Sequence, residues 1–149
     1  MKHAELLDEN CAIARSSGVI GERWVWVILR QAFNGARRFE EFQRGIGLAR
    51  NVLTERLNRL VEEGILERVR YSERPERFEY RLTQKGRDLQ IALTGLVQWG
   101  DKYVSEKPPR ITRRKSDKRP VVAAFVPKGA EVLRADEIEV VDGPGLKAD

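Results

Sequence analysis

Apolar residues in the first third of the chain recur at helical spacing. A short amphipathic helix is predicted by the mixed three- and four-residue spacing of Leu6, Leu7, Cys11, Ile13 and Ala14. Gly18 and Gly21 then interrupt the pattern before a second apolar segment, residues 22–33. Because that segment is apolar on most of its sides, we predict a central helix there, ended by Asn34 and Gly35.

The next two segments predict a pair of helices joined by a glycine turn. Residues 39–45 form the first helix, with two glutamates in the first turn, where the helix dipole favours negative charge. Gly45 and Gly47 favour a turn, and residues 49–63 form the second helix. Its apolar face consists of Ala49, Leu53, Leu57, Leu60 and Val61. Its polar face carries Asn51, Glu55, Asn58 and Glu62. This arrangement is typical of a helix-turn-helix.

Beyond residue 64 the period of the pattern changes from near 3.6 to 2. Residues 65–71 and 78–82 are predicted as strands, and residues 72–77, which include Pro75, as the loop between them. The resulting β-hairpin has arginines at its tip. The expected fold is therefore mainly α with a small β-hairpin wing, a winged helix-turn-helix.

A last long helix is predicted after the hairpin. Thr83 suits its N-cap, and the helix ends near Ser105. Its apolar positions have a four-three-four-three spacing at Leu89, Leu93, Leu96, Gly100 and Tyr103. Such a seam late in a chain indicates either a dimer contact or packing on its own domain. The candidate dimerisation residues are Leu89, Leu93, Leu96 and Tyr103.

Charge is distributed unevenly along the chain, which carries a net +5. The net charge is +3 over residues 1–107, +6 over residues 108–130 and −4 over residues 131–149. A basic body followed by a more basic link suggests a polyanionic partner, of which nucleic acid is the commonest.

This change in composition also predicts the domain organisation. Residues 1–107 are expected to form the DNA-binding and dimerisation domain, and residues 108–149 a basic linker plus a C-terminal extension. Within the extension, residues 121–126 and 137–141 are either two short strands of a hairpin or part of a disordered tail. The linker from Arg110 to Arg119 either adds phosphate contacts or serves as a tether.

The second helix of the helix-turn-helix is the candidate reader of DNA bases, because a helix fits the major groove. The residues near its start or on its outer side are Arg50, Asn51, Thr54, Glu55 and Asn58. Asparagine can bind adenine with two hydrogen bonds, glutamate can accept from cytosine, and arginine can bind guanine or a phosphate. The alternative is an ordinary solvated helix face.

Arginines around this helix are candidate phosphate contacts: Arg37, Arg38, Arg68, Arg70, Arg74 and Arg77. The first two precede a helix N-terminus, whose unpaired amides attract anions. The last two lie at the wing tip. For the pair on the strand face the alternative is an ion pairing with Glu67 and Glu79 across the hairpin.

Other kinds of chemistry lack their residues. One cysteine, Cys11, and one histidine, His3, are too few for an internal disulfide or a structural zinc site. No glycine-rich phosphate loop or nucleophile elbow occurs, so we expect no enzyme, no cofactor and no metal. No apolar run approaches the roughly 18 residues of a membrane span, and the start lacks signal-peptide features, so a cytoplasmic protein is expected.

Many of these residues stand together in one pattern at fixed spacings. It consists of Cys11, Gly21-Glu-Arg-Trp24, Ile28-Leu29, Gly35-Ala-Arg-Arg-Phe39, Leu53-Thr-Glu-Arg-Leu57, Leu60, Glu63-Gly64, Arg68, Pro75, Glu79-Tyr-Arg-Leu-Thr83, Gly86 and Trp99. The pattern closely resembles the HxlR-type winged helix-turn-helix regulators, which are related in architecture to MarR-type regulators. The resemblance implies a homodimer through terminal helices that binds an inverted repeat near promoters, usually as a repressor and sometimes as an activator.

The resemblance has two departures and one further implication. Glu22 and Arg23 stand where the family commonly has Gly-Lys, and Ala12 stands where it has Pro. In some members the cysteine that resembles Cys11 senses oxidants or electrophiles, which implies an oxidant or small-molecule effector. A small cysteine buried among apolar side chains is the alternative. For the whole chain, the alternative is a winged-helix module that binds an acidic protein partner.

Overall fold

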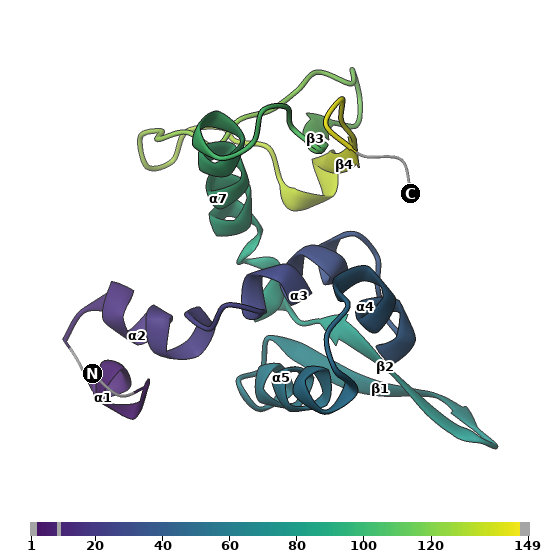
Figure 1. The fold of residues 1–149 in the computed structure, drawn as a ribbon. Coiled ribbons are helices and arrows are strands. Elements are labelled where there is room, and N and C mark those ends of the chain that lie inside the picture. Colours follow the sequence, from purple (N-terminus) through teal and green to yellow (C-terminus); the bar gives the residue numbers. More distant parts are fainter. Residues whose placement is uncertain (1–2, 9, 147–149) are drawn as a thin grey trace. The chain divides into compact units, whose positions relative to one another are not determined.

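The computed structural model describes residues 3–8 and 10–146 (Figure 1). The chain divides into two compact units, one ending at Arg87 and the other beginning at Asp88. The predicted fold, mainly α with a β-hairpin wing, is confirmed in the first unit. No helix in the described ranges is long and apolar enough to cross a membrane.

Two short helices open the first unit, where the sequence pattern predicts one. Helix α1 (His3–Asp8) and helix α2 (Ala12–Ile20) are separated at Cys11, whose extended backbone (φ −146°, ψ 122°) begins α2. Gly18 does not interrupt α2 but is buried within it. The prediction of a single helix was wrong because an extended N-cap residue leaves the apolar spacing on both sides of it intact.

The core of the first unit forms among three helices and the base of the wing. Helix α3 (Val25–Phe33) is the predicted central helix, and it buries four side chains against α4 (Phe39–Ile46) and the wing. Helix α5 (Arg50–Glu62) lies on the other side of the glycine turn. The fully buried large side chains are Phe42, Ile28, Leu29, Leu53, Leu57, Leu60, Ile65 and Leu66. Each stabilises the fold by about 1.5–3 kcal/mol through burial.

The turn between α4 and α5 depends on Gly47. Its φ of +78° lies in the left-handed region, which a residue with a Cβ adopts only with strain. The Gly47 amide donates to the carbonyl oxygen of Gln43 over 2.7 Å and so ends α4. The predicted helix-turn-helix is therefore present, with the first helix one residue longer at its end and the second one residue shorter at each end.

The wing is longer than the sequence pattern predicts. Strand β1 (Leu66–Glu73) pairs antiparallel with β2 (Glu76–Leu82), from Leu66 opposite Leu82 to Glu73 opposite Glu76. The predicted six-residue loop is wrong, because only Arg74 and Pro75, joined by a cis peptide bond, turn between the strands.

The wing is anchored to the helices at two places. The Tyr80 amide of β2 donates to the carbonyl oxygen of Arg37 over 2.6 Å, next to the start of α4. After β2, the Thr83 hydroxyl accepts from the Gly86 amide over 3.1 Å, which caps the short helix α6 (Gln84–Arg87) as predicted. The long helix expected from Thr83 is, however, interrupted, and α7 (Gln90–Tyr103) is a separate element.

The second unit consists of α7 and a two-stranded sheet. Strand β3 (Arg110–Arg114) pairs antiparallel with β4 (Ile138–Asp142), which follows a single 3-10 turn, η1 (Ala135–Glu137). Residues 121–126, one of the two predicted strands, form no strand. The expectation of a solvated basic linker was wrong at 110–114, because these residues pair with β4.

Candidate nucleic-acid interface

Helix α5 presents one polar face outward. Its inner side chains, Leu53, Leu57 and Leu60, are fully buried. The opposite side exposes all five predicted base-reading residues, Arg50, Asn51, Thr54, Glu55 and Asn58. The last four are spaced at i, i+3, i+4 and i+7, so they form a single stripe. The structure therefore brings these residues together.

Three of these residues have local partners, and one of them, Glu55, accepts from Nη1 of Arg56 over 3.3 Å. The Thr54 hydroxyl donates to the Arg50 carbonyl oxygen over 2.8 Å, so it is left to offer an acceptor and a methyl group on the exposed face. The Arg50 guanidinium lies over the Phe39 ring, with its central carbon 4.5 Å from the ring centroid. Arg50 is thus held at the start of α5 and against α4.

The N-terminus of α4 is organised by Glu41. Its carboxylate accepts from the amides of Arg37, over 2.7 Å, and Arg38, over 2.9 Å. These hydrogen bonds, the one from Arg38 first, hold the pKa of Glu41 below its ordinary value. The amides at this helix end therefore already have an anionic partner within the chain.

The two arginines before α4 differ in how far their guanidinium groups remain available to bind another molecule. The Arg37 guanidinium donates to the carbonyl oxygens of Ala32, over 3.0 Å, and Ala36, over 2.9 Å, so it holds the loop after α3. The Arg38 guanidinium lies over the Tyr71 ring at 4.7 Å. Arg38 thereby connects the helix-turn-helix to the wing while its side chain stays exposed.

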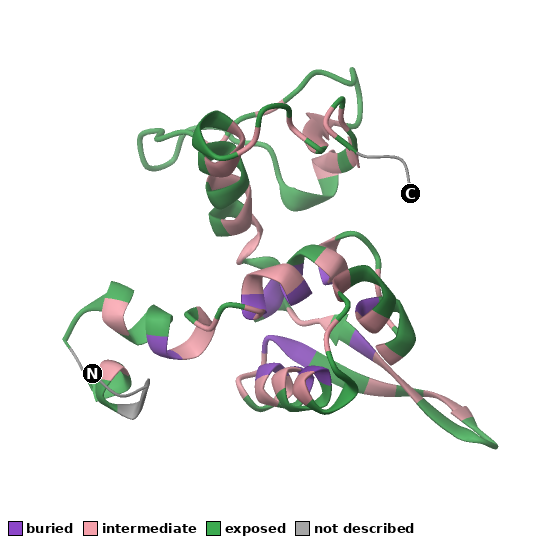
Figure 2. Ribbon diagram, viewed as in Figure 1, coloured by how far each residue is buried: buried purple, intermediate pink, exposed green. Residues whose placement is uncertain are grey.

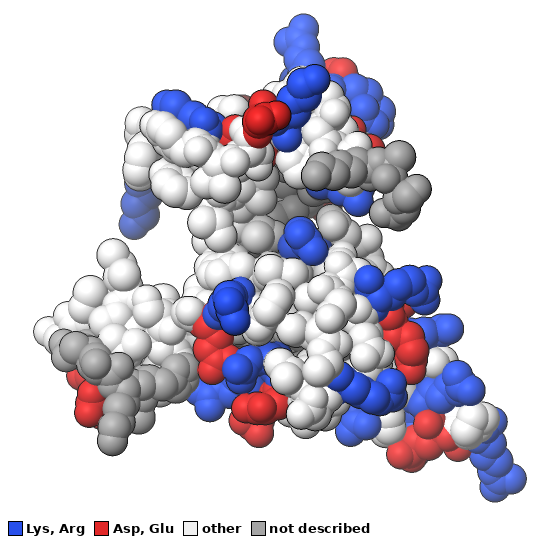
Figure 3. Space-filling view, in the orientation of Figure 1, with Lys and Arg blue, Asp and Glu red and all other residues white. Residues whose placement is uncertain are grey.

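The wing carries the remaining predicted phosphate contacts. Arg68 stacks on the Phe78 ring at 3.9 Å, and Arg70 pairs with Glu76 over 3.2 Å. The pairing with Glu67 and Glu79 that the sequence left open does not form, since Glu79 instead pairs with Arg81. Arg74 and Arg77 are exposed beside the turn. Figure 3 shows Lys and Arg side chains gathered along the wing and at its tip.

Sequence reasoning missed the ring stacking that fixes these arginines. The sequence carries a partial signal for it, because Arg70 faces Phe78 across the hairpin and Arg68 lies diagonal to it in the observed register. That register depends on a bulge between Arg70 and Ser72, which no local pattern in the sequence marks.

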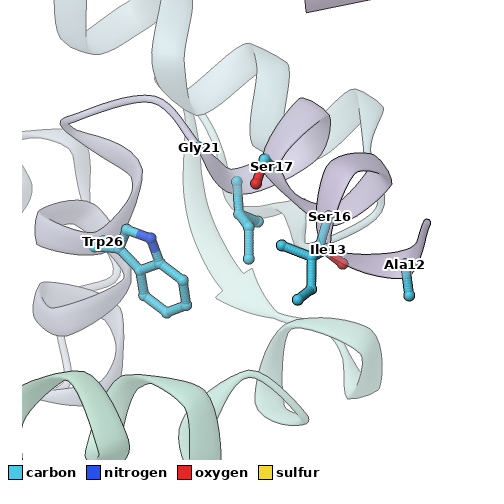
Figure 4. Close-up of a pocket in the computed structure, with 7 residues that line it drawn as sticks. Ala12, Ile13, Ser16, Ser17, Gly21 and Trp26 are labelled. Carbon is cyan, nitrogen blue, oxygen red and sulfur yellow. The ribbon is translucent and has the colours of Figure 1, made fainter. Parts of the chain in front are cut away.

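Cys11 is exposed, so the alternative of a buried structural cysteine is wrong. The backbone amides of Ala14 and Ile13, in that order, lower the pKa of the thiol. Beside it, α2 and Trp26 of α3 line an open apolar hollow of about 300 Å³ (Figure 4). The sequence pattern did not predict this hollow.

Helix α7 carries the predicted dimerisation seam. Leu89 and Leu93 are half-buried, whereas Leu96 and Tyr103 are exposed. The Trp99 ring, which the seam does not include, contacts the Tyr103 ring with centroids 5.6 Å apart and is 57% exposed.

Basic side chains between Arg110 and Lys118, after α7, form ion pairs with carboxylates of the same unit. Arg110 pairs with Asp142 and Arg114 with Asp117. Glu139 receives both Arg113, over 2.8 Å, and Lys118, over 3.0 Å. These cations stabilise the β3–β4 sheet locally.

Comparison with known proteins identifies the family of this chain. The model of the HxlR-like helix-turn-helix family matches residues 19–108. The chain belongs to this family. The HTH-type transcriptional regulator Rv3095 of Mycobacterium tuberculosis, itself uncharacterized, is 41% identical over 143 residues, covering 94% of this chain and 90% of its own.

Solved structures agree with this assignment. PA1607, a candidate transcription factor, has a TM-score of 0.75 at 39% identity and covers 92% of this chain and 98% of its own. The reduced redox regulator HypR has a TM-score of 0.58 at 30% identity and covers 62% of this chain and 92% of its own. The HxlR-like chain is thus a DNA-binding helix-turn-helix regulator, and its relatives are regulators, not enzymes.

These relatives differ in how much of this chain they match. A match over 92% or 94% of this chain has to include most of residues 108–149, so Rv3095 and PA1607 share the C-terminal extension. HypR matches a much smaller part of the chain.

Proposed function

We propose that this protein is a repressor that binds an inverted-repeat operator as a homodimer. Helix α5 enters the major groove, and the wing lies on the backbone or in the minor groove. The observation that carries the proposal is the exposed stripe of hydrogen-bonding side chains on α5, opposite its fully buried leucines. A helix that only coats DNA needs positive charge more than this variety of donors and acceptors.

Each residue of the stripe has a role that its chemistry supports. Asn51 and Asn58 bind adenine edges, and Glu55 accepts from a cytosine amino group. Arg50 binds guanine or a phosphate from its place over Phe39. Each good bidentate base contact contributes roughly 1–3 kcal/mol of discrimination.

Phosphate contacts come from the arginines that remain available around α5. Arg74 and Arg77 have exposed side chains at the wing tip, and Arg38 and Arg68 are held by ring stacking with their side chains exposed. Stacking reduces the conformational entropy that an arginine loses on binding a phosphate. Arg37 contributes less in this proposal, because two backbone carbonyls already take its donors.

The proposed homodimer uses the terminal helices, with Leu89, which precedes α7, and Leu93, Leu96 and Tyr103 of α7 in the contact. Exposure of Leu96 (47%) and Tyr103 (64%) in the single chain supports this role. A two-fold dimer predicts two half-sites centred about one helical turn of DNA, or a multiple of it, apart.

An oxidant effector acting at Cys11 is a second part of the proposal. The thiol is exposed at the start of α2, and its pKa is lowered by the amides of Ala14 and Ile13. Reaction of the thiolate with hydrogen peroxide yields a sulfenate and water, which adds an oxygen atom and so changes size and hydrogen bonding at the N-terminus of α2. A change in DNA affinity on peroxide treatment, absent in Cys11→Ser, tests this part separately.

Selection of bound fragments from a random duplex pool tests the main proposal. The purified full chain is used at about 150 mM salt, where weak nonspecific contacts are largely suppressed. An enriched inverted repeat supports the dimeric reader. A lack of enrichment, with and without reductant, overturns sequence-specific binding by the free protein and favours first a ligand-dependent regulator and second a winged-helix module that binds an acidic protein.

Repression itself needs its own readout. A reporter gene with the selected repeat overlapping its promoter is expected to lose expression when the protein is present. Increased expression would instead make the protein an activator on the same operator.

A further inference from the structure

The C-terminal unit has no buried residue in its described part. Figure 2 shows only half-buried and exposed residues from Asp88 onward, whereas the first unit has a buried core. Many of its large apolar side chains, on α7 and on the extension, are exposed. A unit that leaves every apolar side chain at least partly exposed has little burial energy to offset the entropy lost on ordering its chain. Its apolar surface therefore requires a partner.

Part of that surface is a stretch that we name the apolar arm, residues 121–126. It contains no charged residue and forms no strand. The Ala123 amide donates to Gln98 Oε1 over 2.9 Å, and Gln98 Nε2 donates to the Ala123 carbonyl oxygen over 3.2 Å. At its start, the Val121 amide donates to the Thr112 carbonyl oxygen over 3.0 Å. The arm is thus fixed to β3 at its start and to α7 at its centre.

Three of the arm's large apolar side chains are exposed to solvent. Val122 is 74% exposed, and Phe125 is exposed to its full extent, at 108%. Val126 is also exposed. The hydrogen bonds that hold the arm in place use its backbone, so the side chains remain available to another surface.

We propose that the apolar arm packs against α7 of a second copy of this chain. The proposal rests on the homodimer proposed above and extends its interface to Val122, Phe125 and Val126. Gln98 supports a second copy as the occupant, because it joins the arm directly to the helix that carries the exposed dimerisation seam. In a two-fold interface both copies present the same patch to each other. If that patch includes the arm and α7, the arm of one copy lies against α7 of the other.

Charge favours the same occupant. Helix α7 has no charged residue between Gln90 and Gly100, and the arm has none. Two uncharged apolar surfaces fit the core of a homodimer interface, from which charged residues are depleted, and do not fit DNA or an acidic protein. Rv3095 and PA1607, whose matches include most of the extension, have the length needed for the same arrangement.

Sedimentation equilibrium of the full chain tests the arm. Phe125→Ser is expected to raise the dimer dissociation constant at least tenfold, about 1.4 kcal/mol. Since the Phe125 side chain is fully exposed in the single chain, this change does not act through the fold of the monomer. The control is Glu131→Ser, an exposed residue of the same extension outside the arm, which leaves the constant unchanged. A dimer that forms equally well with Phe125→Ser overturns the inference.

Photo-crosslinking locates the contact independently. With a benzophenone analogue at position 125, a mixture of light and heavy-isotope chains is expected to give cross-links between chains that end within residues 90–103. Cross-links only within one chain, or to other parts of the partner, overturn the arm contact and leave the dimer standing. A wild-type chain that stays monomeric at all concentrations overturns the proposed homodimer and this inference together.

Discussion

Glu22 and Arg56 form an ion pair between the residues that precede α3 and the outward-facing helix α5. Oε2 of Glu22 lies 2.8 Å from Nε of Arg56, and both atoms are inaccessible to solvent. The two groups do not have hydrogen-bond geometry, so their attraction is Coulombic. The pair links the segment after α2 to the helix that carries the base-reading stripe.

Neutralising Glu22 is therefore expected to leave Arg56 with the exposed Glu55, 3.3 Å from its Nη1, as its remaining carboxylate partner. Because both side chains are partly solvated, Glu22→Gln should lower the free energy of unfolding by about 1–2 kcal/mol, less than for a fully buried pair. Urea unfolding of the full chain, followed by tryptophan fluorescence, measures the change. The matched control is Glu62→Gln, at an exposed position of α5, the helix that carries Arg56. It is expected to change stability by less than about 0.5 kcal/mol. Equal effects of the two variants would remove any role for the pair.

Asn51→Ala and Asn58→Ala are expected to relax sequence preference at particular base pairs. Each variant removes a bidentate partner for adenine, so the penalty for a wrong base at one position should fall by roughly 1–3 kcal/mol. Binding to a panel of single-base variants of the selected operator measures this. If Asn51→Ala weakened all sequences equally, the assignment of the groove-facing side of α5 would be incorrect.

Arg74→Ala is expected to lower the affinity for DNA without changing the sequence preference. Arg74 lies at the tip of the wing, and a phosphate contact carries no sequence information. The variant should weaken all DNAs about equally and reduce the slope of log affinity against log salt by about one unit. Titrations at several salt concentrations, with operator and unrelated DNA in parallel, give both numbers. A loss confined to the operator would place Arg74 at a base edge.

The helix-turn-helix was predictable because its two determinants are local. Leucines at helical spacing define the buried face of α5, and Gly47 marks the turn. The wing was predicted in kind but not in length. Its outer residues, from Ser72 to Arg77, project beyond the core, so the alternation of apolar and polar residues that marks a half-buried strand is missing there.

The C-terminal sheet was beyond local reasoning for a different reason. Residues 110–114 have the composition of a solvated linker, and their strand partner lies 28 residues further along at Ile138–Asp142. Oppositely charged residues that face each other on the two strands, such as Arg113 and Glu139, stabilise the pairing. Such complementarity becomes visible only once the register is known.

Acid is expected to weaken the pair between Arg114 and Asp117. The hydrogen bond from the Arg114 side chain is the main cause that lowers the pKa of Asp117 from 3.8 to about 2. Because the folded-state pKa is below the unfolded one, the stabilisation is fully present above about pH 4 and is lost as the pH falls towards 2. An NMR titration of the Asp117 carboxyl carbon should give a midpoint near 2. In Arg114→Gln the midpoint should move towards 3.8, and no movement would contradict the assigned cause.

Cys11 is expected to react faster near neutral pH than an ordinary exposed cysteine. The amides of Ala14 and Ile13 stabilise the thiolate, so the pKa of the thiol lies below 9.0, its ordinary value. A lower pKa means a larger thiolate fraction at pH 7. The rate of iodoacetamide alkylation, followed by intact mass across a pH series, should therefore have its midpoint at a lower pH than that of a free cysteine peptide.

A single-cysteine variant with the thiol moved along the same helix supplies the control. Ser16 is exposed on α2 but lies beyond the first turn, where amides are already hydrogen-bonded within the helix. In the Cys11→Ser background, Ser16→Cys should titrate like the free peptide. If both positions gave the same midpoint, exposure alone would account for the reactivity of Cys11. A lower midpoint at position 11 only would show that the start of α2 activates the thiol, as an oxidant-responsive regulator requires.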